Sequence, residues 1–351
     1  MTSTAGPPPD PVYVFYGFND GVSAVSFVDW KGKQCLLTGD SMGGVALWNL
    51  NTKKCLWNYQ EERGLVQPSI LTCGSWSRGV WSHARGFGIR FWNLDDEKSC
   101  PDEFGLIPCT HIGFCGAAST TARSKDCSEG RDSIVVPVEK DERCALEVYE
   151  IWESQLRRVG SVDLSASDST IGAPMSCILT RRSAAWHSPI DPLLLAVGFE
   201  SGVVQIWQLN QNESTFIAQE KLLGESILAM DFLADQRFGV CVSPEKVISS
   251  WRLVDGDGDS MRIEKREDIL LPRPGASAAC IRGDGKIFGV GGWDGKIRVF
   301  SCKTLKPLAV LQFHSETIRC MSFCADKVNG RRLMAVGSKD QALSLWCLYS
   351  D

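Results

Sequence analysis

This sequence of 351 residues lacks long hydrophobic runs. Its longest ones, such as Leu193 to Val197, fall far short of the roughly 20 residues that an α-helix needs to span a bilayer. The first eleven residues are rich in proline and contain neither a basic start nor the apolar segment of a secretory signal. We therefore expect no association with a membrane, and a cytoplasmic and nuclear location for the chain.

A surplus of basic residues is also missing. Lysine and arginine number 37 against 42 aspartate and glutamate residues, so the net charge is −5. Binding to nucleic acid depends largely on basic side chains that neutralise phosphates, so we predict that the chain binds no nucleic acid. The 15 cysteines are odd in number and follow no framework spacing, which indicates reduced thiols rather than disulfides.

Residues for catalysis and metal binding are scarce as well. Only four histidines occur, and the sequence contains neither a phosphate-binding G-x-x-x-x-G-K-[ST] loop nor a G-x-S-x-G nucleophile elbow. Cys109, His111, Cys115 and Cys127 form a loose cluster whose spacings match no common zinc module. The segment Asp255–Asp259 imitates the start of a calcium loop but is not followed by the glycine and glutamate that such a loop needs. We expect no metal, no cofactor and no enzymatic activity.

What the sequence does contain is a repeat, in which an apolar run carries an aromatic residue and is followed by a polar turn. The marker aromatics of the seven copies are Trp48, Trp92, Tyr149, Trp207, Trp251, Phe300 and Trp346. Their spacings are 44, 57, 58, 44, 49 and 46 residues. A period of about 40–45 residues is typical of the four-stranded blades of a β-propeller. The two longer intervals indicate insertions, which we place near residues 95–133 and 160–174.

Short runs rich in small residues precede several of the markers, among them Cys35–Asp40, Leu193–Gly198, Ile287–Gly292 and Leu333–Ser338. Glycine and alanine suit strands that crowd around a narrow central channel, where neighbouring blades approach closely. Alternating runs such as Val22–Phe27 come before them and have the period of two that is typical of β-strands. No stretch of comparable length shows a helical period, so the predicted fold class is all-β.

The two ends of the repeat array complement each other. The last blade stops after its third strand, and Val12–Tyr16 is a spare strand before the first complete blade. If the two pair, the ring closes and no sheet edge is left open to aggregation. We predict a single seven-bladed WD-repeat β-propeller over residues 12–351, closed by pairing of the N-terminal strand with the last blade. A disordered, proline-rich lead of residues 1–11 precedes it.

The last blade contains the fullest polar set, which is His314, Ser338, Asp340 and Trp346. This set resembles the structural tetrad of WD repeats, in which Asp, His, Ser and Trp form a hydrogen-bonded chain through a blade. A catalytic His–Asp pair is the alternative interpretation, but these residue types at this spacing already have a structural role in WD repeats. The other six repeats have no clear histidine at the corresponding place.

Several segments in order along the chain resemble one family of WD-repeat proteins. They are the proline-rich start, Arg273–Ser277, Gly292–Phe300, Gly337–Gln341 and the closing Leu345–Tyr349. This set is similar to the family of guanine nucleotide-binding protein subunit beta-like protein 1 and ASTRA-associated protein 1. The resemblance implies a non-enzymatic scaffold that supports biogenesis of the phosphatidylinositol-3-kinase-related kinases of DNA-damage and growth signalling. The implied partners are a kinase-maturation adaptor complex and Hsp90-linked co-chaperones.

Other functions of this fold are possible. We reject a heterotrimeric G-protein β subunit, because the proline run before Val12 leaves no room for the helix that binds a γ subunit. A ubiquitin-ligase substrate receptor or a histone-peptide reader is the principal alternative, since fold alone does not fix function. We expect a monomeric propeller whose interaction surface includes Trp293, Asp294 and Arg298, although blade architecture also explains these three residues.

Overall fold

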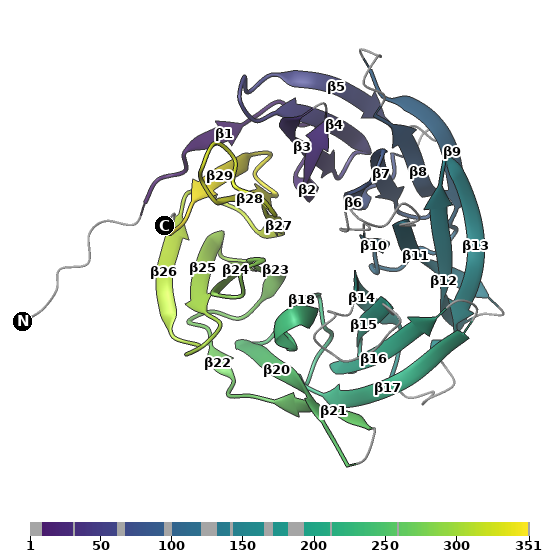
Figure 1. The fold of residues 1–351 in the computed structure, drawn as a ribbon. Coiled ribbons are helices and arrows are strands. Elements are labelled where there is room, and N and C mark those ends of the chain that lie inside the picture. The colour runs from purple at the N-terminus through teal and green to yellow at the C-terminus, as the bar shows by residue number, and fades with distance from the viewer. Residues whose placement is uncertain are drawn as a thin grey trace, which may run out of the picture.

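The strands form a ring of blades around a central channel (Figure 1). The computed structural model describes residues 9–30, 32–61, 67–94, 100–120, 132–140, 143–164, 171–181, 193–210, 213–257 and 260–349. Within these ranges the strands make seven antiparallel sheets, and every element is a strand except the 3₁₀ helix Ala234–Gln236. The same part of the chain contains no helix that is long and apolar enough to cross a membrane.

Each of the first six blades is built from consecutive strands that lead from the channel to the rim. Blade 1 contains β2 (Val22–Trp30), β3 (Lys33–Asp40), β4 (Gly44–Asn49) and β5 (Cys55–Gln60). Blade 2 contains β6 (Ile70–Trp76), β7 (Gly79–Ala84), β8 (Gly88–Asn93) and β9 (Asp102–Pro108). Blade 3 contains β10 (Ala118–Thr120), β11 (Asp132–Lys140), β12 (Arg143–Trp152) and β13 (Gln155–Val162).

The next three blades repeat this order. Blade 4 contains β14 (Pro174–Arg181), β15 (Leu193–Phe199), β16 (Val203–Asn210) and β17 (Glu213–Lys221). Blade 5 contains β18 (Ala229–Leu233), β19 (Phe238–Val242), β20 (Val247–Asp255) and β21 (Met261–Lys265), and β22 (Ile269–Leu270) also pairs with β20. Blade 6 contains β23 (Ala276–Ile281), β24 (Ile287–Gly292), β25 (Lys296–Ser301) and β26 (Pro307–Gln312).

Blade 7 takes its strands from both ends of the chain. It contains β27 (Ile318–Phe323), β28 (Leu333–Ser338), β29 (Leu343–Cys347) and β1 (Tyr13–Phe15). β1 pairs antiparallel with β29, with Tyr13 opposite Leu345 and Phe15 opposite Leu343. The Phe15 side chain is 2% exposed, and its ring lies 5.3 Å from that of Trp48 in blade 1. The predicted closure of a seven-bladed ring by the N-terminal strand is therefore confirmed.

The runs rich in glycine and alanine are second strands, whereas we had expected them to line the channel. They are β3, β15, β24 and β28, which lie almost completely buried between neighbouring blades. A Cβ atom added to Gly291 would lie 2.3 Å from Ile318 of the next blade, and one added to Gly39 would lie 2.4 Å from Ile70. The same contact joins Gly198 to Ile227 and Gly337 to Val22. These glycines are therefore needed because a β-branched side chain of the next blade occupies the space of their own.

All seven marker aromatics lie on third strands, which are β4, β8, β12, β16, β20, β25 and β29. Trp251 and Trp346 are completely buried. Trp346 packs in one cluster with Met334 of its own blade and Ile297 of blade 6. The aromatic repeat in the sequence therefore marks the strand that ties each sheet to its neighbours.

The two intervals in which we placed insertions contain regular strands as well as connections. β9 and β10 lie within residues 95–133, and the end of β13 lies within 160–174. Residues 95–99, 121–131 and 165–170 of these intervals lie outside the described residues, as do residues 1–8 of the proline-rich lead. A further long connection joins Arg181 at the end of β14 to Leu193 at the start of β15. We did not expect it, and its residues 182–192 lie outside the described residues.

Candidate protein-interaction surface

One end of the ring gathers the polar networks and several exposed aromatic side chains. Because neighbouring strands are antiparallel, the turns between second and third strands lie at the same end as the connections that enter the first strand of each next blade. We call this end the upper end. The candidate residues of the last two blades lie on such turns and connections.

The polar network of blade 7 runs from the upper end into the sheet. The Nδ1 atom of His314 lies 2.9 Å from Oδ2 of Asp340, and its Nε2 atom lies 2.7 Å from the hydroxyl of Ser344. The indole N–H of Trp346 donates to the same hydroxyl at 2.7 Å. Burial lowers the pKa of His314, against the opposing effect of Asp340. A neutral ring that donates from Nδ1 to Asp340 and accepts at Nε2 from Ser344 satisfies every member of the chain.

Our choice of Ser338 as the hydroxyl of this network is wrong, because Ser344 takes that place. The Ser338 hydroxyl instead donates to the carbonyl oxygen of Glu316 at 3.1 Å and accepts from the backbone nitrogen of Asp340 at 3.2 Å. Ser338 therefore holds the turn, not the indole. The sequence did contain the signal for Ser344, since it lies two residues before Trp346 and successive odd or even residues of a strand share one face.

The position two residues before the marker also carries the polar contacts in other blades, with different chemistry. In blade 4 the indole N–H of Trp207 donates to Oε1 of Gln205 at 3.0 Å. In blade 2 this position is Arg90, which binds Glu61 from the preceding connection at 2.8 Å, and the Glu61 carboxylate is only 2% exposed. These pairs could not be predicted from the sequence, because their residue types differ from blade to blade.

Two of the three residues that we assigned to the interaction surface pair with each other. Arg298 holds Asp294 through two bonds, Nη1 to Oδ1 at 3.0 Å and Nη2 to Oδ2 at 2.6 Å. Both side chains are less than a tenth exposed, and the Arg298 guanidinium lowers the pKa of Asp294. The pair therefore fixes the turn between β24 and β25. Trp293 on the same turn is 45% exposed, and its ring covers Gly275 (φ +91°).

The turn that carries Trp293 packs directly against the connection that carries His314. A Cβ atom on Gly295 would lie 2.6 Å from the carbonyl oxygen of His314, and the hydroxyl of Thr317 donates to the carbonyl of Trp293 at 3.4 Å. Phe313 on this connection is 40% exposed. We call Trp293 and Phe313 the upper patch. Exposed aromatic side chains on a rigid support are typical of protein-binding surfaces.

A second exposed apolar pair lies at the upper end between blades 2 and 3. Ile112 is 69% exposed and Phe114 is 61% exposed. The Arg85 guanidinium stacks 4.3 Å from the centre of the Phe114 ring, and its Nε atom donates to the carbonyl of Ile112 at 2.7 Å. The connection between β9 and β10 is thus fixed in place while its two apolar side chains face outward.

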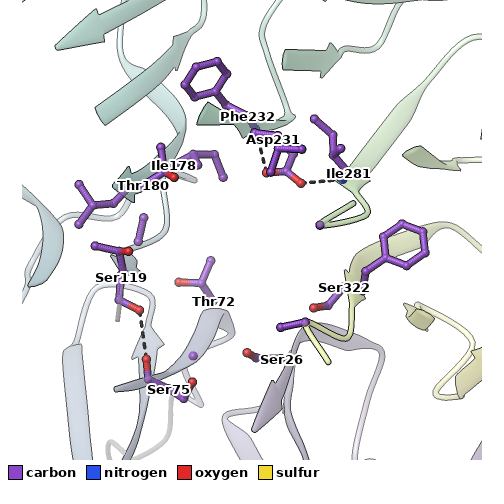
Figure 2. A pocket seen from close by; sticks show the side chains of 18 of the residues that line it. Ser26, Thr72, Ser75, Ser119, Ile178, Thr180, Asp231, Phe232, Ile281 and Ser322 are labelled. Carbon is purple, nitrogen blue, oxygen red and sulfur yellow. Dashed lines mark hydrogen bonds between the residues drawn. The ribbon is translucent and has the colours of Figure 1, made fainter. Parts of the chain in front are cut away.

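The central channel contains a cavity of about 850 Å³. Its wall includes residues from the first strands of all seven blades, and seven of them carry hydroxyl groups: Ser26, Thr72, Ser75, Ser119, Thr120, Thr180 and Ser322. Figure 2 labels all of these except Thr120. The ionisable groups of the described wall, apart from thiols, are Asp231, Asp235 and Arg181, with no histidine among them. This set lacks the base–carboxylate pair that proton-transfer catalysis most often uses.

The structure places a cysteine from outside the predicted cysteine–histidine cluster beside His111. Cys144, which the sequence analysis did not include, has its Sγ atom 3.7 Å from Nδ1 of His111. Cys109 instead donates to the carbonyl oxygen of Pro137 at 2.8 Å, and Cys127 lies outside the described residues. Across the described ranges no three His, Cys, Asp or Glu side chains converge as metal ligands would, and the described cysteines are free thiols.

Seven sheets, six of four strands and one of five, define a WD-repeat β-propeller together with their third-strand aromatics and the His–Ser–Trp network of blade 7. The β-propeller domain of Cps50 (Swd1) from Myceliophteria thermophila superimposes with a TM-score of 0.70 over 97% of this chain and 100% of that one, at 15% sequence identity. This likeness shows the fold alone.

Similarity to particular proteins extends over nearly the whole chain. Guanine nucleotide-binding protein subunit beta-like protein 1 of Mus musculus is 29% identical over 99% of both chains. ASTRA-associated protein 1 of Schizosaccharomyces pombe is 26% identical over 97% of this chain and 99% of its own. No protein-family model matches the sequence. The resemblance that the sequence motifs indicated is therefore confirmed.

Proposed function

We propose that this chain is a non-enzymatic scaffold in a multi-protein complex that supports the biogenesis and stability of phosphatidylinositol-3-kinase-related kinases. The observation that carries the proposal is the nearly full-length similarity to ASTRA-associated protein 1, whose name states an association with ASTRA. The partners under this proposal are a kinase-maturation adaptor complex and Hsp90-linked co-chaperones. The chain acts as a monomeric propeller in the cytoplasm and nucleus.

The surface chemistry supports a protein partner. The upper patch offers two half-exposed aromatic side chains, and aromatic anchors supply much of the binding energy of protein interfaces. The Asp294–Arg298 pair and the His314 network fix the backbone beneath them, so the patch needs no ordering on binding. A net charge of −5 gives the chain no general attraction for nucleic acid.

A quantitative pull-down of the tagged full-length chain from cells tests the proposal. We expect the wild type to recover the kinases or their adaptor complex, and the double variant Trp293→Ala/Phe313→Ala to recover at most about a tenth as much, as expected for loss of hot-spot aromatics. Leu308→Ala is the matched control, because Leu308 lies in the same blade and is 44% exposed but belongs to β26 at the rim.

Recovery of other proteins in the pull-down would overturn the proposal. Recovery of ubiquitin-ligase subunits or of histone peptides, without the kinases or the adaptor complex, would support the alternative functions of this fold. Equal recovery of the adaptor complex by all three proteins would leave the kinase role standing but would exclude the upper patch as its binding surface.

A further inference from the structure

The cavity of the central channel has the size and the chemistry of a binding site. Its volume of about 850 Å³ falls within the range of about 300–1,000 Å³ that is usual for ligand sites. It reaches the lower end of the ring, because Ala234 and Asp235 after β18 and Cys324 and Ala325 after β27 belong to its wall. The cavity therefore extends along the axis to the lower ends of the first strands of blades 5 and 7.

The Asp231 carboxylate lines this cavity, and among the described residues it has no positive partner. Oδ1 of Asp231 accepts from the backbone nitrogen of Phe232 at 2.8 Å, and Oδ2 accepts from that of Ile281 in blade 6 at 2.6 Å. Figure 2 shows the carboxylate held between these two groups at the edge of the open space. Within the described residues no lysine or arginine forms an ion pair with Asp231.

A half-buried carboxylate without a counter-charge is costly, because desolvation disfavours its ionised form. Burial raises the pKa of Asp231 to about 6, against the effect of the two N–H donors. The group is therefore mainly ionised at neutral pH. In the described wall two carboxylates, Asp231 and Asp235, face one guanidinium, Arg181, so the cavity has an excess of negative charge.

The rest of the wall suits a long cationic side chain better than a metal ion. The hydroxyl oxygens of Ser26, Thr180 and Ser322 can accept hydrogen bonds from several N–H donors at once. Apolar residues such as Ile178 and Leu233 line the same cavity and can pack against a methylene stem. A divalent cation would need several carboxylate or carbonyl ligands at one point, which the described wall does not bring together.

We propose that the central channel binds an arginine or lysine side chain that a partner polypeptide inserts along the axis, with Asp231 as its counter-charge. The partner is thus a basic peptide segment, and the hydroxyl groups of the wall supply the remaining acceptors. This site is separate from the upper patch and goes beyond the role in kinase biogenesis, so either proposal can fail without the other.

Two acetylated five-residue peptides test the site on the full chain. One has a central arginine between alanines, and the other has citrulline, which keeps the shape but removes the charge. Ligand-observed NMR at millimolar peptide measures the affinity. We expect the arginine peptide to bind at least about tenfold more tightly than the citrulline peptide, because hydrogen bonds between charged groups are roughly twice as strong as those between neutral groups.

Two variants of the wall complete the test. Asp231→Asn is expected to lower the affinity for the arginine peptide about tenfold or more. Asp235→Asn, at an exposed site, is expected to change this affinity less than about threefold. Ser322→Lys places an ammonium group in the channel while Asp231 stays intact, and it is expected to abolish binding. Thermal unfolding shows whether each variant is folded.

Several results would overturn the proposal. Equal affinity for the arginine and citrulline peptides would show that the positive charge does not contribute to binding. Unchanged binding in folded Ser322→Lys would place the peptide outside the channel, even if Asp231→Asn unfolds because its contact with Ile281 is lost. The absence of any binding of the arginine peptide would exclude the site.

Discussion

Blades 7 and 5 contain the same pair of residues on their third strands but use it differently. In blade 7 Ser344 joins the indole of Trp346 to His314 and Asp340. In blade 5 Ser249 stands two residues before Trp251 as well, yet the Ser249 hydroxyl and the Trp251 indole N–H are buried with no hydrogen-bond partner among the described residues. The same sequence signature therefore does not imply the same network.

Blade 5 holds its tryptophan by packing instead. The Trp251 ring stacks on Phe232 with centroids 4.8 Å apart and an angle of 11° between the planes. A Cβ atom on Gly239 would lie 2.2 Å from the same ring. Both blades therefore need a buried aromatic residue on the third strand. Of the two, only blade 7 adds a hydrogen-bonded network to it.

Removal of either ring should have the largest effect. Trp346→Ala and Trp251→Ala are each expected to lower the free energy of unfolding by about 3–5 kcal/mol, because each leaves a large cavity in a completely buried site. Urea denaturation of both variants beside the wild type measures this. A loss confined to Trp346→Ala would show that the network, not the packing, holds the blades.

Removal of the histidine should affect blade 7 next most strongly. His314→Ala leaves Asp340 and Ser344 without their shared partner, and we expect a loss of about 2–3 kcal/mol in the same assay. Phe313→Ala is the neighbouring control, and its exposed side chain should contribute within about 0.5 kcal/mol. Equal effects of the two substitutions would contradict the structural role of the network.

Exchange of tryptophan for phenylalanine sharpens the comparison, because it keeps most of the ring and removes the N–H. Trp346→Phe breaks the bond to Ser344, so we expect it to cost about 1–2 kcal/mol more than Trp251→Phe, which removes an N–H without a partner. The difference between the two denaturation midpoints reports this cost. A larger loss for Trp251→Phe would mean that its N–H has a partner in solution.

Acidification should act on the two blades in opposite directions. Burial lowers the pKa of His314, so the unfolded chain binds a proton more readily there and blade 7 loses stability as the pH falls below about 6.5. Burial raises the pKa of Asp231 on β18 to about 6, so the folded state binds the proton more readily and blade 5 gains about 1 kcal/mol of stability between pH 7 and pH 5.

Hydrogen exchange, corrected for its intrinsic pH dependence, measures the stability of each blade separately. His314→Gln and Asp231→Asn should each abolish the effect in their own blade, and a uniform response of both blades would contradict this assignment.

The architecture could be predicted from the sequence because its signals are local and repeated. The period of the aromatic markers located every third strand, and the spare segment Val12–Tyr16 revealed the closure that β1 and β29 make. Alternation along single strands and spacing between repeats do not depend on which blades come into contact. These features can therefore be predicted from the sequence without knowing which residues come into contact in the fold.

The contacts between strands and blades could not be predicted in the same way. Ser338 and Ser344 both stand near Asp340 in sequence, and only the register of β28 against β29 places Ser344 beside the indole. We expected the run that contains Gly291 to line the channel, because nothing in the sequence of one blade shows that Ile318 of the next blade fills the space beside this glycine. Arg90 and Glu61 lie 29 positions apart in the sequence, and no repeated pattern indicates that they pair.

Depletion of the chain from cells followed by rescue tests the central claim most directly. Levels of the phosphatidylinositol-3-kinase-related kinases are measured after re-expression of the wild type, Trp293→Ala/Phe313→Ala or Leu308→Ala at equal amounts. We predict that depletion lowers the kinases, that the wild type and Leu308→Ala restore them, and that the double variant does not. Kinase levels that stay unchanged on depletion would contradict the proposed scaffold role and leave a WD-repeat propeller with another partner.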